Sequence, residues 1–168
     1  MLIFALDSTT AVATVAICQD ETPLSLYTRQ NGNTHSQTLL PMAQSLLDGL
    51  SLHADDIDLF ACTTGPGSFT GVRIGAATVK GLAFNRGKPC VGVSSLESLA
   101  YNLIGFDAIV CSVLHARQFV YCALFRSHNG ELTRLCEDSI YRILPAAESE
   151  LESAVKRSYS QRLPSRSS

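Results

Sequence analysis

The feature of this sequence that most constrains its fold is a change in the spacing of its apolar residues near residue 35. Before this point, short apolar segments alternate with polar turns, which predicts an antiparallel β-meander over residues 2–6, 12–18 and 24–29. After it, apolar residues recur at helical spacing over residues 35–50. A chain that changes period in this way must pack a helix onto a sheet, which predicts an α/β fold.

The next residues continue the alternation of strands and helices. We predict two further strands and two further helices, at residues 57–63 and 89–93 and at residues 72–84 and 96–103, respectively. With the meander they complete an N-terminal lobe over residues 1–104. The helix at 72–84 is rich in glycine and alanine, and its only charges are Arg73 and Lys80. A helix with so few large side chains must be covered on more than one side.

A second, shortened lobe is predicted over residues 105–145. Its expected elements are a hairpin of strands 108–114 and 119–125 and one more strand within 131–144. A lobe of this kind needs more strands and helices than this segment supplies. Residues 146–168 end in a serine- and arginine-rich stretch, a composition that predicts a disordered tail.

Composition narrows the classes of function. The formal net charge of −2 argues against a surface dedicated to coating DNA or RNA, which needs a basic excess. No apolar run approaches the roughly 20 residues that span a membrane. The six cysteines are widely spaced, without a C-x-x-C pair, and most lie in apolar runs. This pattern predicts buried, reduced thiols and a cytoplasmic protein, not disulfides or a metal cluster.

Residues 65–71 read Gly-Pro-Gly-Ser-Phe-Thr-Gly and precede the bare helix, which leaves two interpretations. The loop could hold a phosphate with its backbone N–H groups. However, Pro66 removes one donor, and no P-loop Gly-Lys-Ser/Thr follows. We favour a tight strand-to-helix turn that presents Phe69 and Arg73 at a surface, and the two roles can coexist where a nucleotide lies at a junction with a partner.

Asp7 also has two interpretations. Its carboxylate could position a water on Mg²⁺ beside a phosphate. Alternatively, the Asp-Ser-Thr-Thr sequence of residues 7–10 could only turn and cap the first hairpin, which we favour. His35 also has two interpretations, as a residue at the start of a helix or as a general base, and we favour the first.

Seven segments of this sequence resemble the bacterial TsaB (YeaZ) family, in the order and at the spacing of that family. They are residues 2–10, 35–36, 39–41, 65–71, 72–75, 80–83 and 92–97. The resemblance extends over about residues 1–125. No single segment is specific, but the combination is.

The resemblance implies the ASKHA fold, a ribonuclease H-like fold shared by actin, Hsp70 and sugar kinases. It also implies a non-catalytic scaffold subunit of the complex that makes N6-threonylcarbamoyladenosine at position 37 of tRNA. The implied partners are the related transferase TsaD, in a heterodimer, and the ATPase TsaE, with tRNA reached only through the complex. Asp7, Ser8, Thr9 and Thr10 lie where ASKHA enzymes hold ATP phosphates. ATP or ADP at the partner interface is therefore the one cofactor that the resemblance allows.

The chain departs from TsaD at two positions that matter for catalysis. TsaD carries two histidines four residues apart, which lie on one helix face and can share a metal. Here the matching positions are Ser95 and Leu99, so we predict no metal site and no catalytic residue. The family's Asp-Ala-Arg in the second-lobe hairpin reads His-Ala-Arg at residues 115–117.

The helices at 35–50 and 72–85 suit packing against a similar pair across a two-fold or pseudo-two-fold axis, since one offers a leucine stripe and the other glycine and alanine. The resemblance implies that homodimer and TsaD heterodimer both form through these helices. The predicted interface residues are His35, Leu39, Met42, Ala43, Leu46, Gly67, Phe69, Arg73, Ile74, Ala77, Thr78 and Gly81. We expect the Leu46→Asp change to abolish TsaD binding while leaving the lobe folded.

Two other functions stay open. An ATP-dependent ASKHA enzyme would bind Mg-ATP through Asp7 and Thr9, and Asp7→Ala would stop its reaction. A metallopeptidase of the glycoprotease type would purify with stoichiometric zinc or iron.

Overall fold

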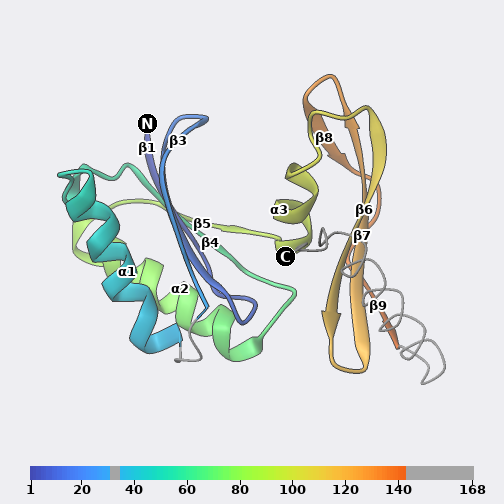
Figure 1. Cartoon of the computed structure of the whole chain (residues 1–168), viewed down its shortest axis with the longest axis horizontal. Helices are drawn as coiled ribbons and strands as arrows, with labels where there is room; N and C mark the ends of the chain where they lie inside the picture. The colour runs from blue at the N-terminus through green and yellow to red at the C-terminus, as the bar shows by residue number, and fades with distance from the viewer. Residues whose placement is uncertain (31–34, 143–168) are drawn as a thin grey trace, which may run out of the picture.

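The computed structural model describes residues 1–30 and 35–142, which form two β-sheets with helices beside them (Figure 1). The first sheet has the strand order β3-β2-β1-β4-β5. β1 pairs antiparallel with β2 and parallel with β4, so the predicted meander is confirmed and a crossover follows it. Its strands are β1 (Leu2–Asp7), β2 (Ala13–Gln19), β3 (Thr22–Arg29), β4 (Leu59–Thr63) and β5 (Cys90–Val93).

Helices α1 (His35–Gly49) and α2 (Phe69–Ala83) pack together on one face of this sheet (Figure 1). Alternate residues of the strands and the apolar stripe of α1 form its core. The fully buried members include Phe4, Val15, Ile17, Leu39 and Leu46. Short 3-10 turns, η1 (Ala54–Asp56) and η2 (Phe84–Arg86), connect the helices to β4 and β5.

The second sheet consists of β6 (Ala108–Ala116), β7 (Phe119–His128), β8 (Glu131–Arg134) and β9 (Ser139–Arg142). Helix α3 (Ser95–Tyr101) packs on β6, β7 and β8, where Leu96 and Ala100 join Val110, Ala123 and Phe125 in a separate core. By its packing, α3 therefore belongs to the second lobe, although the sequence analysis placed it in the first. The division falls between β5 and α3, about ten residues before the predicted boundary at residue 104.

The predicted single strand within 131–144 is two strands in the structure, β8 and β9. They pair with successive parts of the same edge of β7. Between them, Leu135 N donates to Leu124 O (2.8 Å) and Leu124 N donates to the Cys136 sulfur (3.2 Å). The Cys136 side chain thus replaces a ladder carbonyl at the point where the strand is broken.

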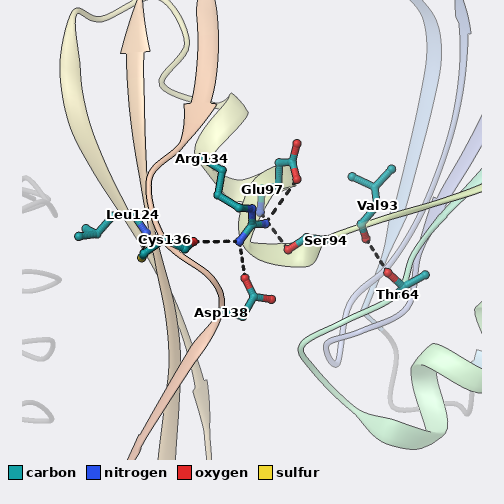
Figure 2. Close-up of polar contacts among 8 residues, drawn as sticks. All are labelled: Thr64, Val93, Ser94, Glu97, Leu124, Arg134, Cys136 and Asp138. Carbon is teal, nitrogen blue, oxygen red and sulfur yellow. Dashed lines mark hydrogen bonds and ion pairs between the residues drawn. The ribbon is translucent and has the colours of Figure 1, made fainter.

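Arg134 links this broken edge to α3 (Figure 2). Its guanidinium donates to Asp138 Oδ1 (2.6 Å) and to Glu97 Oε2 (3.4 Å), and lies 4.7 Å from the centre of the Phe125 ring. Desolvation opposes the positive charge, but the hydrogen bonds and charges of Asp138 and Glu97 outweigh it and raise the pKa of Arg134. The charged side chain therefore holds β8, the β8–β9 connection and α3 together.

The cysteines only partly follow the prediction that they are buried. All six are free, and Cys62 is buried, but Cys90, Cys111 and Cys136 are exposed. Burial raises the pKa of the Cys62 thiol, with a smaller contribution from Cys90. Cys90 lies on the edge strand β5, and Cys111 lies on the face of β6 away from α3, so apolar neighbours in sequence do not cover them.

Two further predictions concern the limits of the described chain. The predicted disordered tail at 146–168 lies outside the described residues. Among the residues that the structure describes, no helix is long and apolar enough to cross a membrane.

Candidate functional site

The turn between β1 and β2 is organised by the Asp7 carboxylate. Asp7 Oδ1 accepts hydrogen bonds from Thr9 N (2.9 Å), Thr9 Oγ1 (2.7 Å) and Thr63 Oγ1 (2.6 Å). The first two form an Asx-type turn, and the third connects β1 to β4. These contacts support the structural interpretation of Asp7, while a role with Mg²⁺ stays a prediction.

This turn is interlocked with the start of α2. Ser8 Oγ donates to Gly71 O (2.9 Å), and Ser68 N donates to Thr9 O (2.7 Å). A Cβ atom at Gly71 would overlap the Ser8 carbonyl oxygen, so only glycine permits this approach. Ser8 and Thr9 are both buried. The hydroxyl groups of Ser8, Thr9 and Thr10, three of the four predicted nucleotide-binding residues, thus all form hydrogen bonds within the chain.

Helix α2 begins at Phe69, three residues before the predicted start at residue 72. Ser68 is its N-cap, because Ser68 Oγ accepts from Gly71 N (3.2 Å). Residues 69–71, the last three of the seven-residue glycine-rich segment, therefore form the first turn of the helix. This earlier start was not predicted, because Gly71 resembles a loop glycine in sequence, whereas the close contact with Ser8 requires glycine there.

A cleft of about 850 Å³ lies between the two lobes. It is lined by the β1–β2 turn, the starts of α1 and α2, and the β6–β7 hairpin, through residues 9–11, 35, 67–70, 114–117 and 121. His35 Nε2 lies 2.7 Å from the Thr10 carbonyl oxygen, and since that oxygen can only accept, the ring nitrogen donates. His35 thus joins the start of α1 to the turn, as the helix-start interpretation predicts.

The predicted partner interface must be corrected in α1. Leu39, Met42, Ala43 and Leu46 are buried in the core of the first lobe, against the sheet. Their stripe is the face with which α1 covers its own sheet, so these side chains are not available to a partner. A charge at Leu46 would therefore enter the core, contrary to the expectation that the lobe would stay folded.

The α2 part of the predicted interface is accessible. Phe69, Arg73, Ala77 and Gly81 are exposed, and the Arg73 guanidinium lies 5.4 Å from the centre of the Phe69 ring. Ile74 and Thr78 are partly buried, because they lie on the side of the helix that turns toward the sheet. Gly67, in the loop before the helix, is exposed. We call the exposed surface of Phe69, Arg73, Ala77, Lys80, Gly81 and Phe84 the outer α2 face.

Two exposed apolar residues of this helix layer were not among the predicted interface residues. Phe84, just after α2, is 83% exposed, and Leu40 of α1 is 53% exposed. Phe84 lies at the end of the helix, where the spacing of apolar residues does not predict whether a side chain faces the core or solvent. Leu40 lies next to buried residues in the sequence, so its exposure follows only from the way in which α1 is oriented on the sheet.

Ser95 and Leu99, the positions predicted to correspond to two histidines of TsaD, lie in α3. Ser95 is buried and its hydroxyl has no hydrogen-bond partner among the described residues, whereas Leu99 is exposed. Ser95 N donates to Gly65 O (2.8 Å), which joins the start of α3 to the glycine-rich loop. The backbone of this region therefore connects the two lobes.

Both the sequence and the structure of this chain match known proteins. Residues 28–163 match the family model described as TsaD, tRNA N6-adenosine threonylcarbamoyltransferase. Among solved structures, YeaZ from Pseudomonas aeruginosa is 31% identical, with a TM-score of 0.76 over 86% of this chain and 70% of that chain. The α/β, ASKHA-like fold predicted from the sequence is confirmed by these matches.

Two curated relatives carry the name tRNA threonylcarbamoyladenosine biosynthesis protein TsaB. The one from Bacillus subtilis is 34% identical over 82% of this chain and 61% of its own length. The one from Escherichia coli is 39% identical over 60% of this chain and 43% of its own length. The matched part of the chain thus spans about two-fifths to three-fifths of these relatives.

Proposed function

This chain belongs to the bacterial TsaB (YeaZ) family, and from that premise we propose that it is a non-catalytic subunit of the complex that makes N6-threonylcarbamoyladenosine at position 37 of tRNA. In this proposal it acts in the cytoplasm and holds the transferase TsaD in an active arrangement. TsaE and tRNA join through the complex.

The observation that carries the proposal is the outer α2 face. Phe69 and Phe84 are 75% and 83% exposed at its two ends, and the small residues Ala77 and Gly81 lie between them. Large exposed aromatic side chains are common at protein interfaces, and small residues allow helices to approach closely. The residues of this face therefore suit a partner helix that crosses near Ala77.

Two features support a non-catalytic role. Ser95 and Leu99 replace the histidines that TsaD uses for a metal, and leucine has no atom that ligates one. Asp7 Oδ1, Ser8 Oγ and Thr9 Oγ1 form hydrogen bonds within the turn and from the turn to β4 and α2. A homodimer through the helix layer, and ATP or ADP at the junction with TsaD, stay parts of the proposal.

The proposal is tested by reconstituting the modification from purified TsaD, TsaE, tRNA and a threonylcarbamoyl donor, with and without this chain. We expect omission of the chain to lower product formation by at least about tenfold. Full product formation without it would contradict the proposal. ATP hydrolysis by the chain alone that is lost in Asp7→Ala would favour the ASKHA-enzyme alternative instead.

A further inference from the structure

The edge strand β3 is open to a further strand along most of its length. It lies at one end of the first sheet and, among the described residues, pairs only with β2. It has eight residues, whereas β5 at the other end of the sheet has four. Proteins commonly protect sheet edges with proline, lysine or a short strand. In β3, Pro23 and a shift in register between Pro23 and Ser25 interrupt only the first residues, so residues 25–29 form an unprotected edge.

A groove beside this edge has room for the side chains of an added strand. Tyr27 pairs with the core residue Val15, so its side of β3 faces α1. The groove there has a volume of about 420 Å³. It is lined by residues 26–29 of β3 and by Pro41, Met42 and Ser45 of α1. A strand that pairs with a sheet edge gains main-chain hydrogen bonds, and its alternate side chains occupy such a groove. The edge and the groove together therefore suit an extended segment.

The charges of β3 indicate which segment fits. Arg29 is the last residue of the strand, and Glu21 directly precedes its first residue. Both are exposed, and neither forms an ion pair with the described residues. Other exposed arginines are also unpaired, so the informative feature is that opposite charges lie at the two ends of one open edge. A strand with the reverse order of charges satisfies both.

A second copy of β3 has this reverse order when it runs antiparallel. A two-fold axis perpendicular to the sheet, near the centre of β3, aligns the two copies in this way and keeps both α1 helices on one face of the joined sheet. Arg29 of each copy then lies beside the turn that contains Glu21 of the other, and unlike charges on neighbouring strands are stabilising. Leu26, which is 62% exposed, lies at the apolar centre of the contact. A parallel arrangement would bring like charges together.

The strand β6 is another long open edge of the described chain, with nine residues. It contains no aspartate, glutamate, lysine or arginine, so no charges select a partner strand or its direction. The self-complementary order of charges is thus a property of β3 that β6 does not share.

We infer that β3 is a self-recognition edge, through which two copies of this chain pair antiparallel and join their first sheets. The inference goes beyond the proposed function and uses another surface, because α1 packs on β2 and β3 while α2 packs on β1, β4 and β5. Both outer α2 faces therefore stay accessible in the pair. A contact through one strand pair is small, so we expect a dissociation constant on the order of 100 μM.

Sedimentation equilibrium tests the pairing in variants that also carry Ala77→Trp, which blocks contact through the outer α2 face. We expect Arg29→Glu to weaken self-association by about fivefold or more, because it sets a carboxylate beside Glu21 of the other copy. Adding Glu21→Arg reverses both charges and should restore self-association to within about twofold. Arg126→Glu, the same change at an exposed arginine of β7, is the matched control and should have no effect.

Hydrogen exchange locates the contact, with circular dichroism to establish that each variant is folded. Alternate amides of residues 25–29 face away from β2, and we expect them to exchange more slowly at about 500 μM protein than at about 10 μM. Slower exchange in β6 instead, or no change with concentration, would overturn the inference. Equal self-association of Arg29→Glu and Arg126→Glu would also overturn it, as would failure of the reversed pair to restore binding. Because no measurement here involves TsaD, these outcomes leave the proposed function untouched.

Discussion

At the scale of single residues, two glycines of α2 have opposite surroundings. A Cβ at Gly71 would overlap the Ser8 carbonyl, whereas a Cβ at Gly81 would have no atom within 4 Å. We expect Gly71→Ala to lower the free energy of unfolding by at least about 2 kcal/mol, because backbone must move to accept the methyl group. We expect Gly81→Ala to raise it by about 0.5–1 kcal/mol, because alanine favours the helix.

Urea unfolding of the two variants checks this pair of changes. The substitution is identical and both sites lie in one helix, so helix propensity alone predicts the same result at both. Equal stability changes would show that Gly71 does not approach Ser8 as closely as described.

Leu46 is the residue at which the structure most changes the expected result of a mutation. Its side chain is fully buried between α1 and the sheet. We expect Leu46→Asp to destabilise the fold by about 4 kcal/mol or more, because the carboxylate loses its hydration without gaining a partner. Ser45→Asp, on the exposed side of the same helix, should change stability by only about 0.5 kcal/mol.

Thermal unfolding monitored by circular dichroism distinguishes these variants. A folded Leu46→Asp protein with a melting temperature like that of Ser45→Asp would contradict the assignment of this stripe to the core. It would restore the leucines of α1 as candidates for partner contact.

The residue scale also shows where sequence reasoning succeeds. Asp7 and His35 occur in local patterns whose hydrogen bonds depend on near neighbours or on one turn, so their structural roles could be predicted. The accessibility of Leu40 and Phe84 depends on how whole helices are oriented, and no local pattern carries that information.

At the scale of elements, the order of strands and helices followed from the apolar period, but their assignment to lobes did not. Leu96 and Ala100 predict a buried face of α3 without specifying the sheet that buries it. Helix α3 packs on the β6–β7 hairpin because the apolar side chains on that face of the hairpin are buried only when a helix covers them. The break between β8 and β9 was also not predicted. There the Cys136 sulfur accepts the hydrogen bond of Leu124 N, and the spacing of apolar residues does not indicate such a side-chain contact.

Arg134 provides a prediction for the second lobe. Arg134→Met keeps the length of the side chain but leaves Asp138 and Glu97 without their cationic partner. We expect a loss of about 1–2 kcal/mol in stability, a modest value because both carboxylates are partly exposed. Arg126→Met on the same sheet is the control, since Arg126 is exposed and forms no ion pair with the described residues.

Hydrogen exchange locates the effect of this change. Faster exchange confined to α3, β7 and the β8–β9 edge is the expected result for Arg134→Met. Uniform exchange across both lobes, or identical behaviour of the two variants, would contradict the role of Arg134 as a link within the second lobe.

At the scale of the whole molecule, the two lobes meet at the glycine-rich loop and the start of α3, beside a cleft of about 850 Å³. Helices α1 and α2 lie on one side of the first sheet (Figure 1), and Phe69 at the start of α2 also lines this cleft. The fold and the helix pair could be predicted from sequence, whereas the cleft could not, because it depends on how distant segments come together.

The central claim is that this chain binds TsaD through the outer α2 face. Ala77 is exposed at the middle of that face, and a tryptophan there would keep a partner helix from approaching. Ala108→Trp places the same bulk at an exposed position on β6 and serves as the control.

Sedimentation velocity of each variant mixed with purified TsaD tests this claim most directly. We predict a one-to-one complex with the unaltered chain and with Ala108→Trp, and separate sedimentation with Ala77→Trp at micromolar concentrations. A complex that persists unchanged with Ala77→Trp would contradict the account.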